Sequence, residues 1–196
     1  IFVPQSHLTA VAESLQKALA QTIIGSPLNE KVRMGSLAGM SQREEVLTQV
    51  KKLLASSQLI YGSLDSVEVV DADSIKGAFL SPLLLLNEKP FHSNEPHEIE
   101  AFGPVSTLMP YNGMEEAIAL SKLGKGSLVT TIVTNNEQEA KKYVLGTASH
   151  HGRILVLNRD CAKESTGHGS PLPLLVHGGP GRAGGGEEMG GIRGVK

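Results

Sequence analysis

The chain has 196 residues, of which 40% are hydrophobic, and its 18 basic and 20 acidic side chains leave a formal net charge of −2. No apolar run approaches the roughly 20 residues of a membrane-spanning helix, and no basic block offers a surface for phosphates. We therefore expect a globular domain that binds neither membrane nor nucleic acid. The single cysteine cannot form an internal disulfide, which suits a cytoplasmic location.

The two ends of the chain lack the features of natural termini. The sequence opens on the apolar stretch IFVP without an initiator methionine and stops at GIRGVK, inside glycine-rich sequence. Strand edges are rarely left bare at a natural terminus. We therefore expect residues 1–196 to be a segment of a longer protein, so that a catalytic residue can lie outside them.

The first half of the chain predicts two helices and several strands. Apolar residues recur at helical spacing over 8–19, with Ser6 as the N-cap. Ser41 and Glu44 have the spacing of a capping box, which predicts the start of a second helix. The run LLLL at 83–86 predicts a buried strand, and shorter strands are expected near LIYG and VEVV.

The stretch from VSTLMPY to RILVLN carries the clearest pattern in the chain. VSTLMPY, SLVTTIV and RILVLN are strand-like, and the segments between them predict helices that begin at Asn112, with Glu115 three residues on, and at Asn136. Alternating strands and helices at this spacing indicate two successive βαβ crossovers. The sequence therefore predicts an α/β fold with a largely parallel sheet.

The stretch LPLLVHGGPGRAGGG at 172–186 contains HGGPG, which is typical of an oxyanion loop in α/β-hydrolases. In that class a serine nucleophile on a G-x-S-x-G turn follows, and an acid and a histidine come later. Only fifteen residues follow Gly181, and none of them is Ser, Asp or His. A hydrolase would thus need further sequence downstream, and it stays a disfavoured alternative. A dinucleotide fingerprint is also disfavoured, because no helix follows these glycines.

His92, Glu95 and His97 are metal-ligand residue types at close spacing. They lie in a proline-interrupted loop that fixes no common face, which favours a solvated loop over a zinc site. We therefore expect no metal site.

Cys161, beside Asp160 and within reach of His168, has the residue types of a thiolate nucleophile. Free cysteine is commonly a buried structural residue, and no helix N-terminus is predicted next to this one. A structural role for Cys161 is therefore favoured.

Four stretches resemble the catalytic domain of aldehyde dehydrogenases. EAFGPV, from Glu100 to Val105, resembles the family's Glu-x-Phe-Gly-Pro-Val motif. VRMGSLAGMSQREEV resembles its Met-Gly-Pro-Leu segment and the Gln-Arg helix that follows, with Ser36 where proline is usual. EEAIALSKLGKGSLVTTIVTNN and GRILVLN resemble the later helix and strands, in the family's order. The resemblance implies a three-layer α/β catalytic domain with a largely parallel sheet flanked by helices.

The same resemblance implies a function for residues 1–196. Family members oxidise an aldehyde to a carboxylic acid with NADP or NAD. A cysteine thiolate attacks the aldehyde, hydride passes to nicotinamide, and the thioester is hydrolysed. The nucleophilic cysteine is expected just upstream of Ile1, and the general-base glutamate and dinucleotide-binding domain further upstream. The isolated segment is therefore expected to be inactive, with no catalytic residue of its own.

Two cofactor-binding residues are carried over by the motif. Glu100 would accept hydrogen bonds from the nicotinamide ribose hydroxyls, and Phe102 would lie against the nicotinamide ring. Their i, i+2 spacing would place both side chains on one face of an extended segment.

The glycine-rich end of the chain departs from the common pattern of the family. GHGSPLPLLVHGGPGRAGGGEEMGGIRGVK is similar to a branch in which an aldehyde dehydrogenase is fused to a MaoC-like hydratase of phenylacetate catabolism, which opens an oxepin-CoA. This similarity implies a CoA-linked semialdehyde substrate, NADP as cofactor and a homo-oligomer. The stretch at 172–186 would then be a substrate-side and subunit-contact loop. The alternative is a non-catalytic scaffold in which the upstream thiol is replaced.

Overall fold

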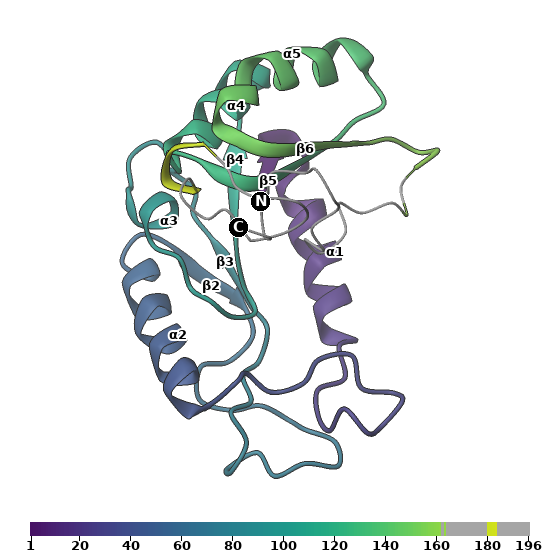
Figure 1. The fold of residues 1–196 in the computed structure, drawn as a ribbon, viewed down its shortest axis with the longest axis vertical. Coiled ribbons are helices and arrows are strands. Elements are labelled where there is room, and N and C mark those ends of the chain that lie inside the picture. Colours follow the sequence, from purple (N-terminus) through teal and green to yellow (C-terminus); the bar gives the residue numbers. More distant parts are fainter. Residues whose placement is uncertain (162, 164–179, 184–196) are drawn as a thin grey trace, which may run out of the picture. The chain divides into compact units, whose positions relative to one another are not determined.

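The computed structural model describes residues 1–161, 163 and 180–183 (Figure 1). The chain divides into two compact units, Ile1–Tyr111 and Asn112–Lys196. We refer to them as unit 1 and unit 2 and describe each by itself.

Unit 1 is built on a four-stranded sheet with the order β1-β4-β3-β2. Strands β1, β4 and β3 run parallel, and β2 is antiparallel to β3 at one edge. In the register of the central pair, Leu83 lies opposite Val105 and Leu86 opposite Leu108. The strands are β1 (Phe2–Pro4), β2 (Gln58–Tyr61), β3 (Leu83–Leu86) and β4 (Val105–Tyr111).

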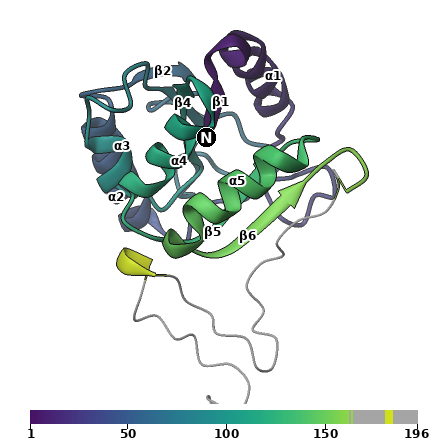
Figure 2. The same cartoon turned by 90° about the horizontal axis from the view of Figure 1, so that it is seen from above.

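Helices cover both faces of this sheet. Helix α1 (Leu8–Ala20) follows the short 3-10 turn η1 (Gln5–His7), and α2 (Met40–Leu53) lies on the opposite side of the sheet (Figures 1 and 2). Neighbouring residues of a strand point to opposite faces, so Leu84 packs with α1 while Leu83 packs with α2. The predicted three-layer arrangement is confirmed in this unit.

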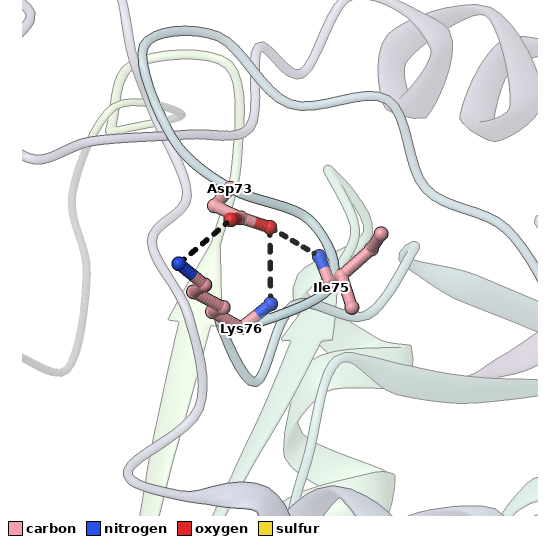
Figure 3. A network of polar contacts seen from close by, with 3 residues as sticks. All are labelled: Asp73, Ile75 and Lys76. Atoms are coloured by element: carbon pink, nitrogen blue, oxygen red, sulfur yellow. Dashed lines mark hydrogen bonds and ion pairs between the residues drawn. The ribbon is translucent and has the colours of Figure 1, made fainter.

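The loop between β2 and β3 is ordered by a carboxylate turn (Figure 3). Asp73 Oδ1 accepts hydrogen bonds from the backbone N–H groups of Ile75 at 2.9 Å and Lys76 at 3.1 Å. The Lys76 ammonium lies 3.9 Å from Asp73 Oδ2, and both side chains are exposed, so this ion pair adds little stability. The turn therefore shapes the loop through its backbone bonds.

Unit 2 contains a parallel pair of strands and two helices that contact one another. The pair is β5 (Ser127–Val133) and β6 (His151–Leu157). The helices are α4 (Gly113–Leu123) and α5 (Glu137–Thr147), followed by the 3-10 turn η2 (Ala148–His150). A further 3-10 turn, η3 (Gly181–Ala183), contacts β5.

Side-chain contacts join the elements of unit 2. The Thr130 hydroxyl on β5 lies 2.9 Å from the hydroxyl of buried Tyr143 on α5. Lys142 of α5 forms an ion pair with Glu115 of α4, and this contact lowers the pKa of the Glu115 carboxyl. Asn136 caps α5, as predicted, by accepting hydrogen bonds from two N–H groups of its first turn.

The division into two sheets corrects part of the predicted topology. The second crossover, from β5 through α5 to β6, is confirmed. The first is wrong as a crossover within one sheet, because β4 belongs to the four-stranded sheet whereas β5 pairs with β6. Near VEVV only Val70 pairs, in an isolated bridge to Gly25. Local pattern indicates a strand but not the sheet that it joins.

Two predicted helix caps are also wrong. Ser6 bonds to the His7 ring instead of to a backbone N–H of α1, which begins two residues later than Ser6. Gly39, not Ser41, is the N-cap of α2.

Among the described residues, no helix has the length and apolar character that crossing a membrane requires.

Candidate functional site

Glu100 and Phe102 lie in the short segment between α3 (Glu95–Glu98) and β4. Both residues are exposed, and Phe102 is 70% exposed. The segment is not extended as predicted, because Gly103 N–H bonds to Ala101 O and Val105 N–H to Gly103 O, both at 2.8 Å. Two tight turns thus precede β4, and strand alternation does not determine where the two side chains point.

Gln42, in the first turn of α2, holds the backbone of this segment. Its side-chain Nε2 donates to the carbonyl oxygen of Phe102 at 2.8 Å, and its Oε1 accepts from the N–H of Ala38 at 2.9 Å. The amide oxygen of Gln42 thus binds the backbone just before its own helix, and the amide nitrogen binds the backbone of the candidate site. No sequence motif predicts Gln42 as a site residue.

Gly103 allows the segment to approach α2 closely. A Cβ atom at this position would lie 2.9 Å from both Cγ atoms of Val46, a core residue that is only 1% exposed. The carbonyl of Pro104 accepts a hydrogen bond of 2.8 Å from Leu83 N–H, which ties the segment to β3. The backbone that carries Phe102 is therefore fixed against both α2 and the sheet.

The exposed ring and carboxylate suit a ligand with a flat ring and hydroxyl groups. Burying a phenylalanine side chain is worth about 1.5–3 kcal/mol. A ligand that covers the exposed Phe102 ring would therefore gain binding free energy up to this amount. An ionised carboxylate offers only acceptors, which match the hydroxyl donors of a ribose. The nicotinamide–ribose end of a dinucleotide has both features, so these residues fit it.

Glu95 and His97 lie in the short helix α3 and not in a loop as predicted, whereas His92 precedes this helix. The Nε2 of His97 lies 2.8 Å from the carbonyl oxygen of Pro90. Among the described residues, no three His, Cys, Asp or Glu side chains gather in a way that could hold a metal ion. In this part of the chain, His92, Glu95 and His97 are thus not gathered as a set of metal ligands.

Cys161 lies in the turn that follows β6 and is half-buried. Its sulfur accepts from Asn158 N–H at 3.3 Å, and its own N–H donates to Asn158 Oδ1 at 3.2 Å. These contacts give Cys161 a structural role in the turn. His168 and most of the stretch at 172–186 lie outside the described residues.

Residues 180–183 are the part of this stretch that the structure describes, and their 3-10 turn η3 contacts β5. Arg182 N–H donates to the carbonyl of Lys125 at 2.8 Å, beside Gly126. A Cβ atom on Gly126 would lie 2.0 Å from the carbonyl oxygen of Pro180, so only glycine fits at this contact.

Ser127 and His151 lie opposite each other at the start of β5 and β6 and form a pair that no sequence motif predicts. The Ser127 hydroxyl lies 2.6 Å from Nδ1 of His151, which is 8% exposed. Burial, and secondarily the neighbouring His150, lower the pKa of His151 and favour its neutral ring. Its Nε2 has no hydrogen-bond partner among the described residues, so these residues supply no acid that would complete a catalytic triad. The pair instead links β5 to β6.

Comparison with known proteins identifies the fold and the family. The sequence profile of the aldehyde dehydrogenase family matches residues 1–190. The chain belongs to the aldehyde dehydrogenase family. Because this match covers nearly the whole chain, the alternative that the chain is an α/β-hydrolase is wrong.

Two curated relatives place the chain within the aldehyde dehydrogenases. Protein MaoC of Klebsiella aerogenes is 50% identical over 83% of this chain and 47% of its own length. The 3,4-dehydroadipyl-CoA semialdehyde dehydrogenase of Aromatoleum evansii is 33% identical over 92% of this chain and 35% of its own length. The chain thus spans about half of the first relative and a third of the second.

Solved structures support the fold of this aldehyde dehydrogenase segment. Betaine aldehyde dehydrogenase of Staphylococcus aureus, solved with NAD⁺, aligns with a TM-score of 0.76 at 17% identity, over 93% of this chain and 34% of that one. Succinic semialdehyde dehydrogenase of Streptococcus pyogenes, solved with NADP⁺, aligns with a TM-score of 0.73 at 22% identity, over 92% and 35%. The predicted α/β class with a mostly parallel sheet is confirmed.

Proposed function

We propose that this chain is the catalytic-domain segment of an NAD(P)-dependent aldehyde dehydrogenase that oxidises a CoA-linked semialdehyde to the carboxylic acid. The observation that carries the proposal is its 33% identity, over 180 residues, to a CoA-semialdehyde dehydrogenase. The similarity of its glycine-rich end to the MaoC-fused branch supports a role in phenylacetate catabolism. We refer to the complete protein as the parent enzyme.

In this proposal Glu100 and Phe102 hold the nicotinamide end of the cofactor. The Glu100 carboxylate accepts hydrogen bonds from the ribose hydroxyls, and the Phe102 ring packs against the nicotinamide and excludes water from that side. When bound, the dinucleotide supplies the hydride acceptor. The exposure of both side chains next to a backbone fixed by Gln42 and Gly103 supports these roles.

The remaining catalytic groups are proposed to lie elsewhere in the parent enzyme. Among the described residues, Cys161 bonds within its own turn, and His151, which contacts Ser127, has no acid on its Nε2 to complete a triad. The nucleophilic cysteine is proposed to lie just upstream of Ile1, because the resemblance to the family implies that position. The NAD⁺ and NADP⁺ complexes of its structural relatives support a nicotinamide cofactor, NAD⁺ or NADP⁺.

Steady-state reduction of NADP⁺ and NAD⁺ by the parent enzyme tests this function. We expect a kcat/KM at least about tenfold higher for a CoA-linked semialdehyde than for the same semialdehyde acid without CoA, because the remote CoA moiety contributes binding energy to the transition state. A protein containing residues 1–196 alone is the control and should be inactive. Equal kcat/KM values would contradict the substrate class, and absence of turnover with every aldehyde would favour a non-catalytic scaffold.

A further inference from the structure

We propose that Gln42 is a positioning residue for cofactor binding, which sets the orientation of Phe102 by holding its backbone carbonyl. This inference rests on the proposed function, because it assigns to Gln42 a role in the same cofactor site. It goes beyond that function in naming a residue that acts on the cofactor only through Phe102.

The contact between Gln42 and Phe102 reaches across the fold of unit 1. The two residues are 60 positions apart in the sequence, and the 2.8 Å bond from Nε2 to the Phe102 carbonyl joins the start of α2 to the segment before β4. The carbonyl of Phe102 belongs to the peptide plane that links it to Gly103. Fixing this plane limits the directions in which the Phe102 Cα–Cβ bond can point.

The Phe102 ring needs this backbone support because its own packing is slight. Phe102 is 70% exposed, so neighbouring side chains do little to restrict the direction of its ring. On the other side of the peptide, Gly103 packs against Val46, also on α2. Helix α2 therefore contacts both residues of the Phe102–Gly103 peptide, and Gln42 makes the directional contact of the two.

The two ends of the Gln42 amide have separable roles. Its Oε1 accepts from Ala38 N–H and so satisfies a backbone donor at the start of α2. Its Nε2 donates to Phe102 and serves the site. Glutamate has the same shape and keeps an acceptor, but an ionised carboxylate cannot donate. The substitution Gln42→Glu therefore retains the helix contact and removes the contact with Phe102.

Gln49 provides a matched control on the same helix. Its side chain bonds within α2, to Glu45, and accepts from Lys52 at 3.1 Å. Gln49→Glu makes the same chemical change and adds the same charge, and it likewise loses its donor contact, here with Glu45, while its new carboxylate can pair with Lys52. It leaves the segment of Phe102 untouched.

A double-mutant cycle in the parent enzyme tests the proposal, with binding of NADPH and NADH followed by fluorescence titration. We expect Gln42→Glu to weaken binding about fivefold, the value of one ordinary hydrogen bond, and Gln49→Glu to leave it unchanged. In a Phe102→Ala background, Gln42→Glu should weaken binding by less than about twofold, because no ring remains to be oriented. Thermal unfolding of each variant checks that the fold is retained.

The outcomes separate this inference from the function on which it rests. If Phe102→Ala leaves dinucleotide binding unchanged, the proposed cofactor role of Phe102 is wrong, and the inference falls with it. If Phe102→Ala weakens binding but Gln42→Glu has the same effect with and without the ring, Gln42 has only a structural or charge effect. That result, or an unchanged affinity in Gln42→Glu alone, overturns the inference while the proposed function stands.

Discussion

Replacement of Glu100 by glutamine in the parent enzyme is expected to weaken dinucleotide binding by roughly tenfold or more, since hydrogen bonds to a charged group are worth about 1.5–3 kcal/mol. The substituted amide keeps one acceptor oxygen but loses the negative charge and gains a donor that faces the ribose hydroxyls. The KM for NADP⁺ or NAD⁺ should rise, and the KM for the aldehyde should change little. Initial rates at varied dinucleotide and saturating aldehyde measure this difference.

Glu88→Gln is the matched control for Glu100→Gln. Glu88 is exposed and lies in the same connection between β3 and β4 but outside the EAFGPV motif, so its substitution changes the net charge equally. We expect its dinucleotide KM to stay at the wild-type value. Wild-type kinetics in Glu100→Gln would contradict the ribose contact.

A second large effect is expected from Gly103→Ala, which adds one methyl group against the core. The new Cβ would lie 2.9 Å from both methyl carbons of Val46, and a buried β-branched side chain has little rotamer freedom to move away. Overpacking of this kind costs about 1–3 kcal/mol. We therefore expect lower stability of unit 1, seen as faster hydrogen exchange of the β3 and β4 amides, together with weaker dinucleotide binding.

Two further variants identify the cause of that loss. Gly35→Ala is the control, because a Cβ atom on Gly35 meets no atom within 4 Å. Val46→Ala removes both methyl groups that the new Cβ would meet, so the double variant Gly103→Ala/Val46→Ala should be more stable than the sum of the single effects predicts. Additive losses would contradict a direct clash between positions 103 and 46.

Strands β4 and β5 and the N-cap of α5 could be predicted because the residues that favour them are neighbours in the sequence. The bounds of β4 and β5 coincide with VSTLMPY and SLVTTIV, whose apolar and β-branched residues favour strands. Asn136 caps α5 as its sequence context indicates. Caps failed where another local partner was available, as for Ser6, which bonds to His7. The division into two sheets depends on long-range pairing, which no local pattern encodes.

The candidate site could be predicted only in part, for a related reason. The motif EAFGPV predicts Glu100 and Phe102 as site residues, because their side chains have recognisable chemistry. No such signal predicts the contact of Gln42, because its partner is a backbone carbonyl, a group that every residue type has, 60 positions away in the sequence. The SQR sequence at the start of α2 is a signal for Gln42 only once the fold brings it to Phe102.

Hydrogen–deuterium exchange of the parent enzyme with and without NADPH tests the central claim most directly, with binding verified by fluorescence in the same sample. We predict slower exchange in peptides that cover Glu100–Val105 and the first turn of α2, because the bound dinucleotide would lie against Phe102 and restrain its contact with Gln42. Unchanged exchange in both segments at saturating NADPH would contradict the claim that this segment holds the nicotinamide end of the cofactor.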